Sequence, residues 1–161
     1  AEDRIVPDAV CAANLGKSVE LRNPNSTRPW QHVLEPLGGY LLLASKSYND
    51  RALNFEAFNF GPNSSYNKTV LELIDTLSLT WPSITSIVRG IETNKKEANL
   101  LQLSCDKADK LLSWRPVLSF NETCEFTASW YQSFYADNDS DMTNVTLNQI
   151  ERYSDLASEK W

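Results

Sequence analysis

Segments with the apolar spacing of amphipathic helices alternate in this chain with short apolar runs that are typical of strands. The helical segments are 5–15, 33–48, 69–79, 106–111 and 119–134, and the strand-like runs are 18–21, 55–60, 84–88 and 100–103. The 161 residues are enough for one domain, which would bury about two thirds of the surface of the unfolded chain. The pattern predicts a single mixed α/β domain over residues 1–161, with 137–161 as a peripheral tail in which 146–153 add one or two helical turns.

Two capping boxes locate the starts of two of these helices. Thr69 is followed three residues later by Glu72, and Ser119 is followed at the same spacing by Glu122. In such a box the hydroxyl and the carboxylate each accept a hydrogen bond from a backbone amide of the first turn. We therefore expect helices to begin next to Thr69 and Ser119.

The charge balance argues against several classes of partner. The formal net charge is -6, and the Lys and Arg residues are scattered. Because phosphate backbones and anionic membranes attract clustered cations, we expect neither nucleic acid nor a membrane as a partner. No run approaches the roughly 18 apolar residues of a membrane span, and the sequence from Ala1 has no basic and apolar leader. These features predict a cytoplasmic protein.

Cysteine usage and glycosylation sequons favour different compartments. Cys11, Cys105 and Cys124 are an odd set without Cys-x-x-Cys spacing, which predicts reduced, buried thiols in the cytoplasm. Asn-x-Ser/Thr sequons, which would be glycosylation sites in a secreted protein, begin at Asn25, Asn63, Asn67, Asn121, Asn138 and Asn144. The chain is rich in Asn, Ser and Thr, so the cytoplasmic interpretation is preferred and a secreted glycoprotein is the alternative.

Motifs for dinucleotide binding and for several kinds of catalysis are absent from the sequence. The glycines form no Gly-x-Gly-x-x-Gly cradle for a pyrophosphate, and no Tyr is followed four residues later by Lys. His32 is the only histidine. Without Cys-x-x-Cys pairs or a second partner it provides neither a zinc site nor a hydrolytic triad, so we interpret His32 as structural. The sequence predicts no catalytic residue, metal or cofactor site in this chain.

Several segments, taken in order, resemble one enzyme family. They are 3–8 (DRIVPD), 22–24 (RNP), 28–37 (RPWQHVLEPL), 39–41 (GYL), 58–63 (FNFGPN), 97–98 (EA), 107–108 (KA), 112–116 (LSWRP), 130–131 (WY) and 146–150 (TLNQI). The chain resembles the extended short-chain dehydrogenase/reductases that act on nucleotide sugars, and within them the CDP-glucose 4,6-dehydratases. The RPWQHVLEPL segment is the most specific of these matches.

The resemblance implies a fold and a role. The chain would be the carboxyl-terminal, mixed α/β substrate-binding subdomain of such an enzyme, without the Rossmann half. In the intact family the Rossmann half carries NAD, a Tyr-x-x-x-Lys pair and acid/base groups. There NAD oxidises C4 of the sugar, water is eliminated across C5 and C6, and the hydride returns from the cofactor to C6. The implied partners are a nucleotide sugar and an amino-terminal Rossmann half, in the same polypeptide or in a separate chain.

The same resemblance implies that two segments pack against the Rossmann half. They are the helix at 33–48, with apolar residues on one face, and the strand at 55–60. In this chain alone both surfaces would be open, and open apolar faces and strand edges promote association. We therefore expect a homo-oligomer or an unstable monomer.

The resemblance also implies a set of residues that contact the nucleotide sugar: Arg4, Pro7, Leu21, Arg22, Arg28, Lys68, Thr69, Glu97 and Asn99. Arg4 and Pro7 would lie along the nucleotide and its phosphates, and Leu21 and Arg22 would lie beside the base or ribose. Arg28 would bind the pyrophosphate, because a guanidinium pairs bidentately with phosphate oxygens. Its alternative role is to hold its own loop against the backbone. Lys68 and Thr69 would meet phosphate at a helix start, where amide dipoles favour anions.

The loop around Glu97 departs from the family pattern. Asn94, Lys96, Asn99 and Ser104 stand where such enzymes usually carry a histidine-rich loop and an acidic residue. The alternative is therefore that the chain has diverged from the family and is a stand-alone, non-catalytic binding or interaction domain. Trp30, within the most specific segment, is expected to be a core anchor.

Overall fold

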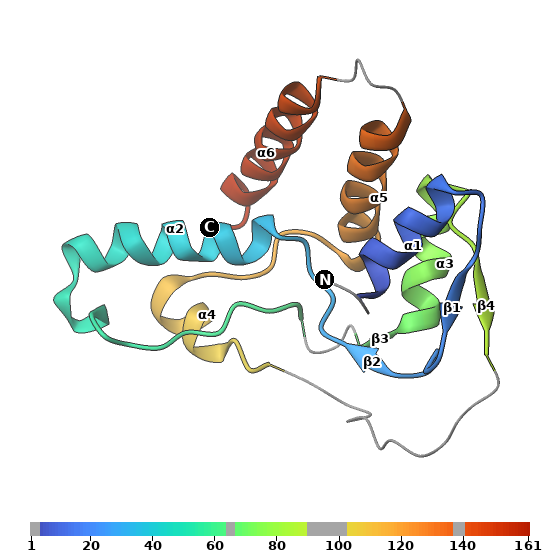
Figure 1. Ribbon diagram of the computed structural model, residues 1–161. Helices are drawn as coiled ribbons and strands as arrows, with labels where there is room; N and C mark the ends of the chain where they lie inside the picture. Colours follow the sequence, from blue (N-terminus) through green and yellow to red (C-terminus); the bar gives the residue numbers. More distant parts are fainter. Residues whose placement is uncertain (1–3, 64–66, 90–102, 137–140) are drawn as a thin grey trace.

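The computed structural model of the chain describes residues 4–63, 67–89, 103–136 and 141–161 (Figure 1). Its elements, in chain order, are α1 (Ile5–Asn14), β1 (Val19–Leu21), β2 (Thr27–Arg28), α2 (Leu34–Asn49), the 3-10 helix η1 (Arg51–Leu53), β3 (Lys68–Thr69), α3 (Val70–Thr80), β4 (Ser86–Val88), α4 (Asp106–Leu112), α5 (Phe120–Ala136) and α6 (Met142–Ser158). The predicted helices that correspond to α1 to α5 and the predicted strands that correspond to β1 and β4 are confirmed, with small shifts at their ends. The predictions for 90–102 and 137–140 lie outside the described residues.

A pair of parallel strands carries the first core. β1 pairs with β4, with Val19 opposite Ser86 and Leu21 opposite Val88. Figure 1 shows α1 and α3 beside this pair, and α5 packs against both helices. The side chains that fill the space between them are fully buried, and they include Val10, Leu21, Ile74, Leu77 and Ile84. The fold is the small mixed α/β type that the sequence predicts.

Both capping boxes form as predicted. At the start of α3, Thr69 Oγ1 accepts a hydrogen bond from the Glu72 amide at 3.1 Å, and the Glu72 carboxylate accepts one from the Thr69 amide at 2.8 Å. Before α5, the Ser119 amide donates to the Glu122 carboxylate at 2.7 Å, and the Glu122 amide donates to Ser119 Oγ at 3.3 Å. The two boxes fix where α3 and α5 begin, and these helices pack closely against each other.

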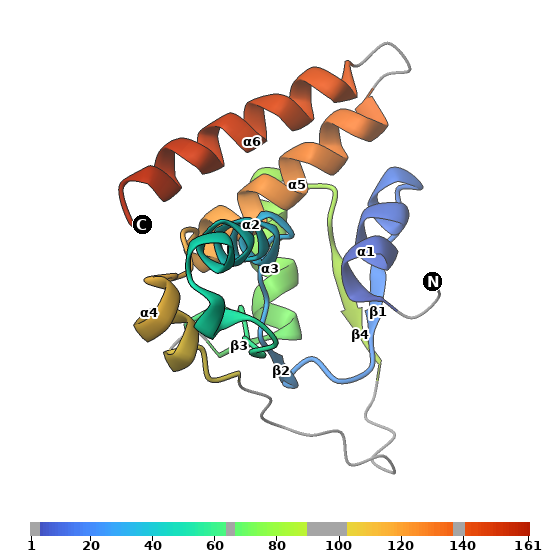
Figure 2. The same ribbon diagram turned by 90° about the vertical axis from the view of Figure 1, so that its left-hand side faces the viewer.

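Two adjacent glycines let α2 approach its neighbours. A Cβ on Gly38 would lie 2.7 Å from the Trp161 ring and 3.0 Å from the Tyr153 hydroxyl. A Cβ on Gly39 would lie 2.5 Å from the Phe60 ring. Such distances are too short for a side chain without rearrangement, so the glycines, which weaken a helix by propensity, are required here by packing. Figure 2 looks along α2, with α4 on one side and α1 and β1 on the other.

The last helix is longer than the sequence indicates. The predicted one or two turns at 146–153 correspond to α6, a helix of 17 residues that begins where the Asp141 side chain accepts a hydrogen bond from the Asn144 amide. α6 lies beside α5 (Figures 1 and 2) and buries Tyr153 and Ala157. Because these two are the buried residues of α6, its apolar pattern is too sparse to indicate the full length of the helix. Within the described ranges, no helix is long and apolar enough to span a membrane.

The predicted strand at 55–60 is wrong for this structure. After η1 the chain turns at Phe55, which has a φ of 65°, and then runs without a strand partner among the described residues. Side chains bond to some of its backbone carbonyls instead, since Gln31 donates to Phe60 O at 3.1 Å and Lys107 donates to Ala57 O at 2.9 Å. A strand is stable only when its backbone forms hydrogen bonds with a neighbouring strand. The local sequence of 55–60 is therefore not enough to make this segment a strand.

One face of α2 is apolar and open. Val33, Leu37, Tyr40, Leu41 and Tyr48, which we call the α2 face, are between 46% and 90% exposed. The buried positions of the helix are Glu35 and Gly39 instead. The predicted exposure of this face is therefore confirmed, and Phe55 at the end of the same region is also fully exposed.

We expect this surface to make the chain self-associate. Contiguous exposed apolar side chains drive association, so sedimentation should show an oligomer whose population rises with protein concentration. Leu41→Glu should shift the equilibrium towards monomer. Leu79→Glu is the matched control, because Leu79 on α3 is 79% exposed and Leu41 is 74% exposed. A sharp wild-type monomer at high concentration, with cooperative unfolding above about 60 °C, would contradict the prediction and favour a stand-alone domain.

Candidate ligand-binding site

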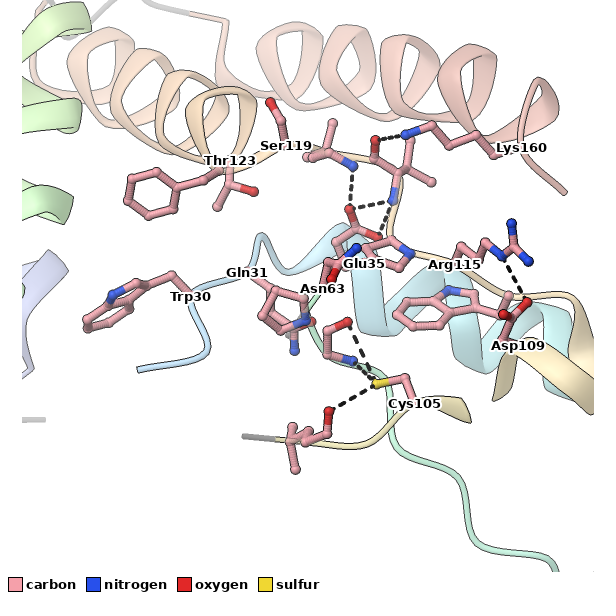
Figure 3. Close-up of a pocket in the computed structure, with 18 of the residues that line it drawn as sticks. Trp30, Gln31, Glu35, Asn63, Cys105, Asp109, Arg115, Ser119, Thr123 and Lys160 are labelled. Atoms are coloured by element: carbon pink, nitrogen blue, oxygen red, sulfur yellow. Dashed lines mark hydrogen bonds and ion pairs between the residues drawn. The ribbon is translucent and has the colours of Figure 1, made fainter. Parts of the chain in front are cut away.

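A cavity of about 1140 Å³ opens beside the starts of α2, α4 and α5 (Figure 3). Its lining residues lie within 30–35, 61–63, 103–109, 114–123 and 159–160. Ligand pockets are typically about 300–1,000 Å³, so this space is large enough for a small molecule. Because the lining ranges are far apart in the sequence, the wall of the cavity forms only when the chain has folded.

Trp30 connects the cavity with a short ribbon formed by β2 and β3. Its indole Nε1 donates to Lys68 O at 2.9 Å, and its ring packs against the first core as predicted. The same side chain lines the cavity (Figure 3). Trp30 thus belongs to the core and also to the wall of the candidate site.

Glu35 holds one wall of the cavity in place. Its buried carboxylate accepts hydrogen bonds from the Val117 amide at 2.9 Å and the Leu118 amide at 2.6 Å (Figure 3). The Tyr153 hydroxyl donates a third hydrogen bond to it at 3.2 Å. Lys160 donates to Val117 O beside it. Burial raises the pKa of Glu35, and the hydrogen bonds from Leu118, Val117 and Tyr153 oppose that rise. The Glu35 carboxylate therefore connects three parts of the chain: helix α2, residues 117–118 before α5, and helix α6.

The charged side chains around the cavity are mainly acidic. Asp106, Asp109, Glu122 and Glu159 line it together with Glu35, whereas the cations in the lining are Arg115 and Lys160. Arg115 Nε is already paired with Asp109 Oδ1 at 2.9 Å (Figure 3). This distribution favours a neutral group over a phosphate inside the cavity.

Two of the predicted phosphate ligands face each other outside this cavity. β2 and β3 pair antiparallel, with Arg28 opposite Lys68. Arg28 Nη1 donates to Thr27 O at 2.8 Å, which corresponds to its alternative structural role, and Lys68 Nζ forms an ion pair with Glu72 at 2.8 Å. The ribbon thus places two cations side by side.

The amides at the start of α3 are already bonded within the chain. Thr69 N donates to Glu72, Val70 N to Ser26 O, and Leu71 N to Pro24 O, and Glu72 N donates to Thr69. The predicted attraction of phosphate to this helix start therefore has no open amide to act through. Lys68 keeps a side chain that could approach an anion, whereas Thr69 serves as a cap.

The other predicted contacts are scattered. Leu21 lies in the first core with 1% exposure and its carbonyl accepts from the Arg89 amide, so its side chain cannot line a base in this structure. Arg22 follows β1 and Arg4 precedes α1, and both are exposed. Pro7 lines a second cavity of about 520 Å³ beside α5 and α6. Glu97 and Asn99 lie outside the described residues.

His32 has the environment of a structural residue, as interpreted from the sequence. Its ring meets Phe126 edge-on at 5.5 Å between centroids, and its Nδ1 accepts from the Leu34 amide at 3.4 Å. Burial lowers the pKa of His32 to about 4, so the imidazole is neutral near pH 7. A neutral ring with these contacts would not bind phosphate as a cation.

The cysteines are only partly as predicted. Cys124 is buried, and burial raises its pKa to about 12; Cys105 is half-buried. Cys11 is exposed on α1, which corrects the prediction that all three are buried. In the part of the chain that the structure describes, no group of three or more His, Cys, Asp or Glu residues is placed to hold a metal ion.

A comparison with known sequences finds a relative of known activity. No family model matches the chain. The chain is 37% identical over 139 residues to CDP-glucose 4,6-dehydratase of Salmonella typhimurium, a match that covers 86% of this chain and 39% of that protein. Over this length the chain is similar to a nucleotide-sugar enzyme of the extended short-chain dehydrogenase/reductase type. It corresponds to the carboxyl-terminal part of that relative.

Solved structures of extended short-chain dehydrogenase/reductases share the fold. UDP-glucuronic acid 4-epimerase from Bacillus cereus matches with a TM-score of 0.67 at 16% identity. UDP-glucose-4-epimerase from Stenotrophomonas maltophila matches with a TM-score of 0.67 at 20% identity. Each match covers 83% of this chain and 41% of the epimerase. The chain thus spans about two-fifths of the length of these relatives.

Sequence reasoning missed three residues that line the cavity. They are Gln31, Glu35 and Trp114. A signal was present for Glu35, since an acidic residue among apolar neighbours in the RPWQHVLEPL segment is a candidate for burial with partners. Gln31 and Trp114 carried no comparable signal, because their roles depend on contacts with segments distant in sequence.

Proposed function

We propose that this chain is the nucleotide-sugar-binding part of an enzyme like CDP-glucose 4,6-dehydratase, which converts CDP-glucose to CDP-4-keto-6-deoxyglucose. The observation that carries the proposal is the 37% identity to that dehydratase over 86% of the chain. The contribution of this chain to the reaction is to bind and orient the substrate. NAD would be held by an amino-terminal Rossmann half, which also supplies the groups for the proton and hydride steps. Cysteines without a disulfide partner suit the cytoplasm as the place of the reaction.

The ribbon of β2 and β3 is the proposed diphosphate site. Like charges directly opposite each other in an antiparallel pair repel, and Arg28 and Lys68 are such a pair. A diphosphate between them would replace this repulsion with charge-assisted hydrogen bonds. Arg28 is the stronger candidate for the contact, because a guanidinium can pair bidentately with phosphate oxygens.

The α2 face is the proposed docking surface for the Rossmann half. The larger part of the relatives' length has no counterpart in this chain. The α2 face is apolar and exposed, and the neighbouring backbone at 56–60 has no strand partner among the described residues. An added sheet edge could pair with this segment while apolar side chains cover α2. One interface would then account for both open surfaces.

Substitution of Arg28 tests the proposed binding role. In the chain combined with an amino-terminal half, Arg28→Ala should weaken CDP-glucose binding by about 1.5–3 kcal/mol, which is roughly a 10- to 150-fold rise in Kd. Cytidine binding should hardly change, because cytidine has no phosphate. Both constants can be measured by titration calorimetry.

Arg152→Ala is the matched control for this experiment. Arg152 is an exposed arginine on α6 that pairs with Glu125 at 2.8 Å and does not line the cavity. Its removal should leave both affinities unchanged. Equal losses of CDP-glucose and cytidine affinity in Arg28→Ala would mean that Arg28 holds its loop and does not contact the diphosphate.

A further inference from the structure

The second cavity, of about 520 Å³, is an apolar groove that we call the α5–α6 groove. Its walls come from the starts of α1 and α2 and from the facing sides of α5 and α6. The apolar and aromatic side chains in these walls include Val6, Pro7, Val33, Trp130, Tyr131 and Ile150. Val33 is 61% exposed and Ile150 is 41% exposed, so the groove is open to solvent. An open apolar surface of this kind commonly marks an interaction site.

The polar groups of the groove are already bonded within the chain. Trp130 Nε1 donates to Thr146 Oγ1 at 2.9 Å, and Gln149 Nε2 donates to Phe126 O at 2.7 Å. The ring of His32 is neutral near pH 7, because burial lowers its pKa to about 4. Among the described residues, the lining contains no Asp, Glu, Lys or Arg. The groove therefore fits apolar side chains better than a charged ligand.

The aromatic side chains of the groove support one another. The Trp130 ring stacks on the Phe134 ring at 5.5 Å between centroids, and it meets the Tyr131 ring edge-on at 5.2 Å. Trp and Tyr are enriched among the residues that dominate the binding energy of protein interfaces. Because these rings already hold each other in place, a partner would lose little free energy in ordering them.

The groove is continuous with the α2 face. Val33 belongs to both, and Leu37, one turn further along α2, is 46% exposed. The α2 face is the proposed docking surface of the Rossmann half. A partner that covers Val33 would therefore reach the edge of the α5–α6 groove.

The direction of the chain also points to this partner. The match to the Salmonella typhimurium dehydratase is to its carboxyl-terminal part, so the larger part of that enzyme precedes the segment that corresponds to α1. Val6 and Pro7, at the start of α1, line the groove. A half that is joined to the chain here would be at high effective concentration beside the groove.

We propose that the α5–α6 groove is a second docking site for the amino-terminal half, which inserts apolar side chains between α1, α5 and α6. The inference rests on the proposed function for the identity of the partner. The interface then extends from α2 onto α6, a helix within the segment that the sequence predicts to be a peripheral tail.

Thiol labelling tests whether the groove is covered. One protein is the 161-residue chain, and the other is the same chain with the part of the Salmonella typhimurium dehydratase that precedes the match fused before residue 1. Because the core of an interface excludes water, Ile150→Cys should react with a thiol reagent at least about tenfold more slowly in the fused protein. Mass spectrometry of the digested protein separates this label from that on the exposed Cys11.

Two positions serve as controls for the labelling. Leu79→Cys should react equally fast in both proteins, because Leu79 lies on α3, is 79% exposed and does not line the groove. Cys124 is buried and should stay unlabelled in both, which shows that the domain is folded.

Affinity measurements provide the second arm. When the amino-terminal part of the dehydratase and the 161-residue chain are mixed as separate proteins, Ile150→Glu should raise the Kd of the complex by a factor of about ten or more. Leu79→Glu is the matched control and should leave the Kd unchanged. Titration calorimetry measures both constants.

Leu41→Cys, on the α2 face, separates this inference from the proposed docking surface. If the fusion protects Leu41→Cys and not Ile150→Cys, the groove assignment is overturned and the α2 face stands as the docking surface. If it protects Ile150→Cys and not Leu41→Cys, the groove assignment is supported and the α2 face is not the docking surface. Fast labelling of both positions in the fused protein overturns both.

A second copy of the chain is the other possible occupant. Protection of Ile150→Cys in the 161-residue chain alone, rising with protein concentration, would show that a second copy fills the groove and would overturn the choice of partner. The nucleotide-sugar role is tested independently by Arg28→Ala.

Discussion

The 161-residue chain on its own is expected to bind no NAD and to convert no CDP-glucose, and activity should appear when an amino-terminal Rossmann half is added. The reason is chemical. The chain has no glycine cradle for a pyrophosphate and no Tyr-x-x-x-Lys pair, so neither the hydride acceptor nor the catalytic base can be positioned. Calorimetry with NAD and chromatography of the sugar nucleotide after incubation measure the two parts of this expectation.

The controls for this experiment are the amino-terminal half alone and the combination with the Arg152→Ala chain. The half alone should be inactive, because it lacks the proposed substrate contacts. The Arg152→Ala combination should match the wild-type combination, because Arg152 lies on α6, outside the cavity lining. Micromolar NAD binding by the 161-residue chain alone would overturn the assignment of the cofactor to the other half.

Glu35→Ala is expected to destabilise the chain by about 2–4 kcal/mol, since it leaves buried donors without an acceptor. The Val117 and Leu118 amides and the Tyr153 hydroxyl all donate to this carboxylate. Urea unfolding followed by circular dichroism would measure the change. Tyr153→Phe removes only one of the three bonds and should cost about 1 kcal/mol.

Glu125→Ala is the matched control for Glu35→Ala. Glu125 is an exposed glutamate on α5 whose partner is Arg152, and exposed ion pairs contribute about 0–1 kcal/mol. The two variants lose the same chemical group in different environments. If both unfold at the same urea concentration, the contacts of Glu35 do not hold the cavity wall.

Local patterns predicted those parts of the fold that depend on local interactions. The helices that start at Thr69 and Ser119 were predicted because a capping box is completed within four residues. The strand predicted at 55–60 failed for the opposite reason, since strand pairing needs a partner that local sequence does not provide. α6 was underestimated because only Tyr153 and Ala157 are buried in it.

The candidate site was harder to predict than the fold. The family resemblance indicated Arg28 and Lys68, and the structure brings these two together across β2 and β3. The family resemblance could not indicate that Leu21 is in the core, because the burial of Leu21 depends on how α1 and α3 pack around it. Gln31 and Trp114 are 83 positions apart in the numbering of the chain (114 − 31), and only the tertiary fold brings both to one cavity.

The bonds of Glu35 also constrain the order of folding. They join the start of α2 to residues 82, 83 and 118 positions later in the chain. Closing such long loops costs chain entropy before any contact compensates for it, so contacts of this kind form slowly. During synthesis, the Tyr153 bond cannot form until α6 has left the ribosome. The strands β1 and β4 and the helices α1 and α3 are all present by residue 88, and their core is closed by α5, which ends before α6 begins. We therefore expect the cavity to be the last part of the chain to acquire its native shape.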